Sequence, residues 1–297
     1  MSLALLLALV LVLAAAALAA CYLGAGVILR PPHMNEPETY PEHFGLRYEK
    51  VSFATRDGLT LKGWFLPSPL GPQEERTLIL CHGWSDNKGD LLKMTLFLNR
   101  DAGFNLLYFD HRSHGESEGE ITTIGFLELR DFEAAVGYLK ENKPRCWSRL
   151  GAFGLSMGAA VVAMAMPDHP EIKAAVLESP FTDYRRVVAQ WAWNNLRVPY
   201  LPLMPIVLLF LRLRVGDSRV DSYSPIRFIP RIAPRPLLLI GGSEDRLMPE
   251  EGVRALHAAA GEPKQLWIVP GAPHAKCHEV AGLEYEARVA GFFQKYL

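Results

Sequence analysis

The fold is decided by residues 149–167, which read RLGAFGLSMGAAVVAMAMP. The stretch begins with a short apolar run typical of a strand and ends with a helix of small residues closed by proline. Between them, Gly154, Ser156 and Gly158 form a G-x-S-x-G frame. A strand that turns into a helix within so few residues strains the central serine and exposes its Oγ, and the two glycines avoid a collision across the turn. We therefore predict Ser156 as a nucleophile; the competing interpretation is a plain Gly/Ser turn.

The rest of the chain alternates apolar strand patterns with helix patterns. Two N-terminal strands are joined by an Asp-Gly turn at residues 57–58, a strong hairpin signal. Beyond residues 149–167, strands are predicted at 46–55, 59–66, 77–81, 105–109, 172–177, 236–240 and 265–269, and helices at 89–100, 124–142 and 280–296. Near-continuous apolar strands separated by helices indicate an α/β fold with a mostly parallel, doubly wound sheet.

Polar residues follow several of these strands directly. His82-Gly83-Trp84 follows strand 77–81, and a His- and Gly-rich loop at 110–117 follows strand 105–109. Asp245 and His274 come after the last two strands. Ligands of open parallel sheets bind beyond the carboxyl ends of the strands, so we expect these side chains to gather with Ser156.

In this order of motifs the chain resembles the α/β-hydrolase superfamily over roughly residues 47–297. The family order of nucleophile, acid and histidine falls on Ser156, Asp245 and His274. The Gly-Glu-Ser loop at 115–117, the Glu-Ser-Pro-Phe sequence at 178–181 and an apolar N-terminus further resemble membrane-anchored, prolyl-oligopeptidase-like members.

The resemblance implies a role for each residue. A serine hydroxyl is a weak nucleophile at pH 7, so His274 would take its proton while Asp245 orients the imidazole. The amides of Met157 and Trp84 would form the oxyanion hole. Removal of one such donor typically raises the activation free energy by about 3 kcal/mol. His82 and Gly83 would shape that loop.

Other assignments stay open at this stage. Glu244 adjoins Asp245 and is an alternative acid, although the family position falls on Asp245. A His274/His278 metal pair is conceivable, but no carboxylate at suitable spacing supports it. We expect Arg112 to pair with a nearby carboxylate. Nothing in the sequence implies a metal or an organic cofactor.

Residues 1–30 form a predicted membrane anchor. No charged residue occurs from Leu3 to Leu29. As a helix this run would be roughly 40 Å long, which is more than the thickness of a bilayer core. The run lacks the basic start of a signal peptide. Cys21 ends a lipobox-like sequence, so a lipid anchor is the competing interpretation. Residues 31–46 are a proline-rich spacer, and the basic residues after the run favour a cytoplasmic catalytic domain.

Composition excludes some classes of function. The formal net charge of −1 gives no sign of nucleic-acid binding, and the four cysteines form no C-x-x-C pair.

An insertion at about 184–224 carries the apolar run 206–211, which is too short to span a bilayer. It could belong to the core, form a lid over the site, or contact the membrane.

The sequence therefore predicts a membrane-tethered serine hydrolase that cleaves a small-molecule acyl ester, thioester or lipid through an acyl-serine. A peptidase or aminoacyl amidase is the first alternative, although the propeller domain of prolyl oligopeptidases is missing. A non-catalytic ligand-binding protein of the same fold is the second. The sequence does not determine the oligomeric state.

Overall fold

The computed structural model describes residues 2–30, 36–196, 200 and 202–297. An eight-stranded sheet forms its centre, with the strand order β1-β2-β4-β3-β5-β6-β7-β8. The strands are β1 (Glu49–Ala54), β2 (Thr60–Leu66), β3 (Arg76–Cys81), β4 (Asn105–Phe109), β5 (Arg149–Leu155), β6 (Ile172–Glu178), β7 (Leu237–Gly242) and β8 (Lys264–Val269). The pairs β1–β2 and β2–β4 are antiparallel, and all the other pairs are parallel. The predicted fold class is thus confirmed.

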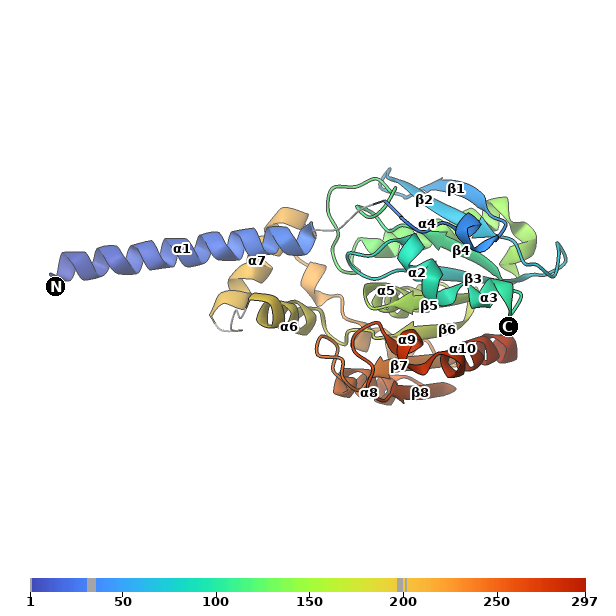
Figure 1. Ribbon diagram of the computed structural model, residues 1–297. Coiled ribbons are helices and arrows are strands. Elements are labelled where there is room, and N and C mark those ends of the chain that lie inside the picture. The colour runs from blue at the N-terminus through green and yellow to red at the C-terminus, as the bar shows by residue number, and fades with distance from the viewer. Residues whose placement is uncertain (1, 31–35, 197–199, 201) are drawn as a thin grey trace.

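Helices cover both faces of the sheet (Figure 1). One core layer packs α4 (Glu128–Asn142), α5 (Met157–Ala165) and α8 (Glu250–Ala259) against it. The other packs α2 (Lys88–Thr95), α3 (Phe97–Arg100) and α10 (Leu283–Tyr296) against the opposite face. Burial on both faces explains why the central strands are apolar throughout rather than alternating.

Two predicted helices differ from the structure at their N-termini. The helix expected from residue 124 begins at Glu128, because Ile124 and Gly125 have positive φ and the Glu128 carboxylate accepts the amide of Gly125. The helix expected at 280–296 is divided into α9 (Cys277–Ala281) and α10 by Gly282, whose φ of 52° and ψ of −125° cannot continue a helix.

The apolar N-terminus forms α1 (Leu3–Leu29), which projects away from the sheet (Figure 1). It is the one helix in the described part of the chain that is long and apolar enough to cross a membrane, and none of its most apolar stretch is buried. One face of its last turns, by contrast, is buried, at Cys21, Ala25, Ile28 and Leu29. Cys21, the alternative lipidation site, lies inside this continuous helix, 3% exposed and with its Sγ 3.8 Å from the Leu203 carbonyl oxygen.

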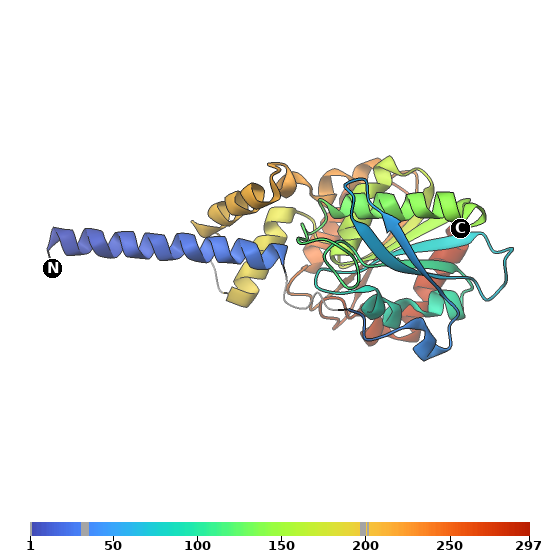
Figure 2. The same cartoon turned by 90° about the horizontal axis from the view of Figure 1, so that it is seen from above.

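The insertion at about 184–224 contains α6 (Tyr184–Leu196) and α7 (Leu203–Val215), which lie beside the end of α1 in both views (Figures 1 and 2). Together with α1 they bury a third apolar cluster outside the two sheet layers. The run 206–211 lies in α7, and there the ring of Phe210 meets that of Tyr22 at 5.5 Å. Of the predicted spacer, residues 31–35 lie outside the described residues, as does Pro199 of the insertion.

Candidate active site

Ser156 occupies a strained turn between β5 and α5. Its φ is 53° and its ψ is −112°, a combination that L-residues rarely adopt. A Cβ on Gly154 would lie 2.5 Å from the backbone of Ala159, and one on Gly158 would lie 2.1 Å from the Cys81 carbonyl oxygen. Both positions therefore admit only glycine, as the frame requires.

A chain of hydrogen bonds joins Ser156, His274 and Asp245. The Ser156 Oγ lies 2.9 Å from His274 Nε2, and His274 Nδ1 lies 2.7 Å from Asp245 Oδ2. An ionised carboxylate can only accept, so Nδ1 carries the proton and Nε2 is free to accept one from the serine. The sheet thus brings together three residues that are up to 118 positions apart in sequence.

The second oxygen of Asp245 is also engaged. Asp245 Oδ1 accepts hydrogen bonds from the amides of Leu247 and Met248, at 2.9 and 2.7 Å. These bonds fix the carboxylate, which is 4% exposed, in the orientation that His274 needs. Glu244, the alternative acid, is exposed instead.

His278 lies apart from the Ser156 site. Its Nε2 is 3.3 Å from Glu286, and its ring stacks on Phe97 at 6.2 Å. No cluster of three or more His, Cys, Asp or Glu side chains suited to a metal ion occurs in the described ranges.

The loop of residues 82–85 passes directly beside Ser156. A Cβ on Gly83 would lie 3.5 Å from the Cβ of Ser156. Met157 is the first residue of α5, so its amide belongs to the free N–H groups of a helix N-terminus. The amides of Trp84 and Met157 remain the predicted oxyanion donors.

Two neutral histidines hold this loop in place. His82 Nε2 accepts the amide of His111 at 2.9 Å, which leaves Nδ1–H to donate to the Gly83 carbonyl oxygen at 2.7 Å. His114 accepts the Ser85 amide at 3.2 Å and donates to the Arg112 carbonyl oxygen at 2.8 Å. Burial lowers the pKa of His82 well below its usual value and that of His114 to about 4. Both rings therefore keep these roles at neutral pH.

Ion pairs with buried basic side chains, Arg112 and Lys88, also hold these loops in place. Arg112 donates to Asp131 and Asp57, both at 2.9 Å, which confirms its predicted pairing with a carboxylate. Lys88, which is fully buried, pairs with Asp110 and Glu116. These pairs fix the loop after β4 against the start of α2 and α4.

A small pocket of about 210 Å³ opens above Ser156 and His274. Its lining is mostly apolar and includes Ile28, Ile124, Val188 and Trp191. One carboxyl group also lines it, that of Asp86, and burial raises the pKa of Asp86 to about 6. Sequence reasoning missed Asp86 and Ile28, because their approach to the site depends on tertiary packing alone.

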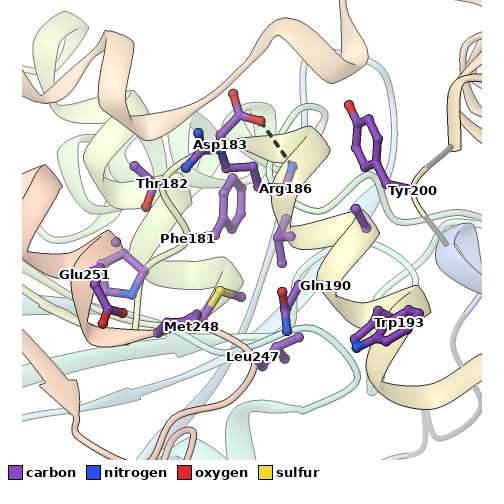
Figure 3. Close-up of a pocket in the computed structure, with 15 residues that line it drawn as sticks. Phe181, Thr182, Asp183, Arg186, Gln190, Trp193, Tyr200, Leu247, Met248 and Glu251 are labelled. Atoms are coloured by element: carbon purple, nitrogen blue, oxygen red, sulfur yellow. Dashed lines mark hydrogen bonds between the residues drawn. The ribbon is translucent and has the colours of Figure 1, made fainter. Parts of the chain in front are cut away.

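A larger cavity of about 570 Å³ adjoins this pocket and shares Phe181, Val187, Leu247 and Met248 with it. In Figure 3, Arg186, Gln190 and Trp193 follow one another along α6, while Leu247 and Met248 come from the segment between β7 and α8. The larger cavity contains neither Ser156 nor His274, and both of these residues line the smaller pocket.

The sequence model described as serine aminopeptidase, S33, a hydrolase family, matches residues 72–206. The Bacillus subtilis protein YqkD is 33% identical over 249 residues, which cover 82% of this chain and 79% of YqkD. YfhR of Escherichia coli K12 is 30% identical over 230 residues, or 76% of this chain and 73% of YfhR. The solved Pyrococcus furiosus esterase Pf2001 superimposes with a TM-score of 0.76 at 28% identity, over 91% of this chain and 98% of Pf2001. This chain belongs to the α/β-hydrolase superfamily.

Proposed function

We propose that the protein is a membrane-tethered serine hydrolase that cleaves acyl esters, thioesters or lipids through an acyl-enzyme on Ser156. The observation that carries the proposal is the unbroken chain of hydrogen bonds from Asp245 through His274 to Ser156 at a strained turn. Nucleophile, base and orienting acid are the three parts that acyl transfer by a serine requires.

The reaction follows from this arrangement. Ser156 Oγ attacks the acyl carbon while Nε2 of His274 takes the hydroxyl proton, and the amides of Trp84 and Met157 receive the charge on the carbonyl oxygen. The tetrahedral intermediate then expels the alcohol or thiol, which leaves with the proton from His274. Water, deprotonated by the same nitrogen, attacks the acyl-Ser156 and releases the carboxylic acid.

Two features favour a lipophilic acyl group as substrate. The pocket above Ser156 is mostly apolar, and the apolar helix α1 ends at that pocket. Burial of each methylene contributes about 0.8 kcal/mol, so such a pocket selects for apolar chains.

The test is hydrolysis of p-nitrophenyl esters from acetate to palmitate by the full chain in detergent. Ser156→Ala should abolish turnover on every ester. Ser148→Ala is the matched control, because Ser148 is exposed and precedes β5 at the end opposite Ser156. Equal rates for wild type and Ser156→Ala would refute the proposal, and a folded wild type without esterase activity would favour a peptidase or a ligand-binding role.

A second candidate is an aminoacyl amidase or peptidase. Asp86 places a carboxyl group in the pocket, where it could pair with a free amino group of the substrate, and the matching family model carries the description serine aminopeptidase. This candidate predicts cleavage of aminoacyl p-nitroanilides at rates comparable to those for esters. It also predicts that Asp86→Asn lowers the rate of amide cleavage more than the rate of ester cleavage. An ester hydrolase would show the same ratio of the two rates in both proteins.

A further inference from the structure

The membrane-anchor helix reaches into the catalytic pocket. Ile28, on the last turn of α1, is 3% exposed and lines the same pocket as Ser156 and His274. The residue before it, Val27, is 38% exposed and does not line that pocket. The two aliphatic side chains therefore point to different surroundings, although they are neighbours in one helix.

Hydrogen bonds hold this last turn to the catalytic domain at two consecutive carbonyl groups. The indole Nε1–H of Trp84 donates to the Ile28 carbonyl oxygen at 3.1 Å. The amide of Thr122 donates to the Leu29 carbonyl oxygen at 2.9 Å. The final carbonyls of a helix have no partner within it, so these bonds satisfy groups that would otherwise be left unpaired.

The same contact reaches the predicted oxyanion loop. Trp84, whose amide we propose as an oxyanion donor, is fixed by its bond to Ile28 on one side and by Trp191 of α6 at a ring distance of 5.7 Å on the other. The end of α1 and the insertion helix α6 thus meet around one side chain next to Ser156. An anchor that only tethered the domain would need none of these contacts.

We infer that Ile28 is a specificity-determining residue, and that the last turn of the anchor helix forms the wall of the acyl pocket that sets the accepted chain length. The inference rests on the proposed acyl-ester hydrolysis. The apolar part of the substrate lies against Ile28, next to the point where α1 leaves the membrane, so the acyl chain and the anchor share one apolar surface. The occupant of the pocket is the acyl chain of a fatty ester.

The experiment compares Ile28→Ala and Ile28→Phe in the full chain with Val27→Ala and Val27→Phe as matched controls. Each variant keeps its backbone carbonyl and therefore the bond from Trp84. The quantity measured is the ratio of kcat/KM for p-nitrophenyl octanoate to that for p-nitrophenyl butyrate. Because all variants are assayed in one detergent, partitioning of the esters affects every ratio equally.

Ile28→Ala should raise the ratio at least about fourfold, since room for one more buried methylene is worth about 0.8 kcal/mol. Ile28→Phe should lower it by a similar factor, and the Val27 variants should stay within twofold of wild type. Active Ile28→Ala with an unchanged ratio, or equal changes in the Val27 variants, would overturn the inference while leaving the hydrolase proposal intact. Absence of Ser156-dependent turnover in the wild type would overturn both.

Discussion

The buried carboxyl group of Asp86 makes the stability of the fold depend on pH. It lines the pocket beside Ser156, and burial, reinforced by the nearby charge of Asp90, raises its pKa to about 6 from an ordinary value of 3.8. The folded state therefore binds this proton more tightly than the unfolded chain does. The stability that the protonated group contributes is fully present below about pH 4 and is lost as the pH rises through about 6.

The size of this loss follows from the two pKa values. A difference of about two pKa units corresponds to about 3 kcal/mol, because each unit is worth about 1.4 kcal/mol. Asp86→Asn cannot ionise, so it should be more stable than wild type at pH 8 by about 3 kcal/mol more than at pH 4. In a chain of this size that difference is a shift in Tm of roughly 6 °C.

The assay is thermal unfolding of wild type and Asp86→Asn in the same detergent at pH 4, 6 and 8. Comparing the two proteins at each pH cancels the titration of the groups that do not interact with Asp86. Asp168→Asn is the control, since Asp168 is exposed and its ion pair with Arg231 is worth at most about 1 kcal/mol, so its removal should change Tm far less between pH 4 and pH 8 than Asp86→Asn does. A Tm difference between Asp86→Asn and wild type that does not vary with pH would contradict the raised pKa of Asp86.

Three further substitutions test other parts of the structure. Gly158→Ala should lower Tm or prevent folding, because its Cβ would lie 2.1 Å from a backbone oxygen. Gly137→Ala should stabilise the protein by about 0.5–1 kcal/mol, because Gly137 lies on α4 with open space around it. Equal Tm values for the two variants would contradict this. Arg112→Lys removes the guanidinium group that joins the carboxylates of Asp131 and Asp57, and should lower the free energy of unfolding in urea by about 3 kcal/mol. A decrease below about 1 kcal/mol would contradict the role of these ion pairs. Asp245→Asn should lower kcat on p-nitrophenyl esters by about 10³–10⁴, while Glu244→Gln leaves it unchanged; the reverse pattern would make Glu244 the acid.

The sequence predicted the sheet and the meeting of polar side chains at its edge, because both follow from local patterns. An apolar run followed at once by a polar residue identifies a buried strand and its carboxyl end, and parallel strands bring those ends to one edge. Ser156, Asp245 and His274 could therefore be placed near one another without knowledge of the strand order. The amphipathic helix α8, with Val253 and Leu256 buried, went unpredicted even though its pattern is also local.

What the sequence could not provide depends on contacts between distant segments. Nothing in the composition of residues 3–29 distinguishes a helix that projects freely from one whose last turn lines the pocket beside Ser156, because Ile28 is one apolar residue among many. The pKa of Asp86 likewise depends on burial that its neighbours in sequence do not reveal. Both features arise where α1, α6 and the loop of residues 82–85 meet.

Covalent trapping tests the assignment of Ser156 as the nucleophile most directly. The full chain is treated with a fluorophosphonate probe, digested and examined by mass spectrometry, with Ser156→Ala and Ser148→Ala alongside. We expect one labelled site, Ser156, with labelling lost in Ser156→Ala and retained in Ser148→Ala. An unlabelled wild type that is folded, or a label on any other serine, would contradict the assignment of Ser156 as the nucleophile.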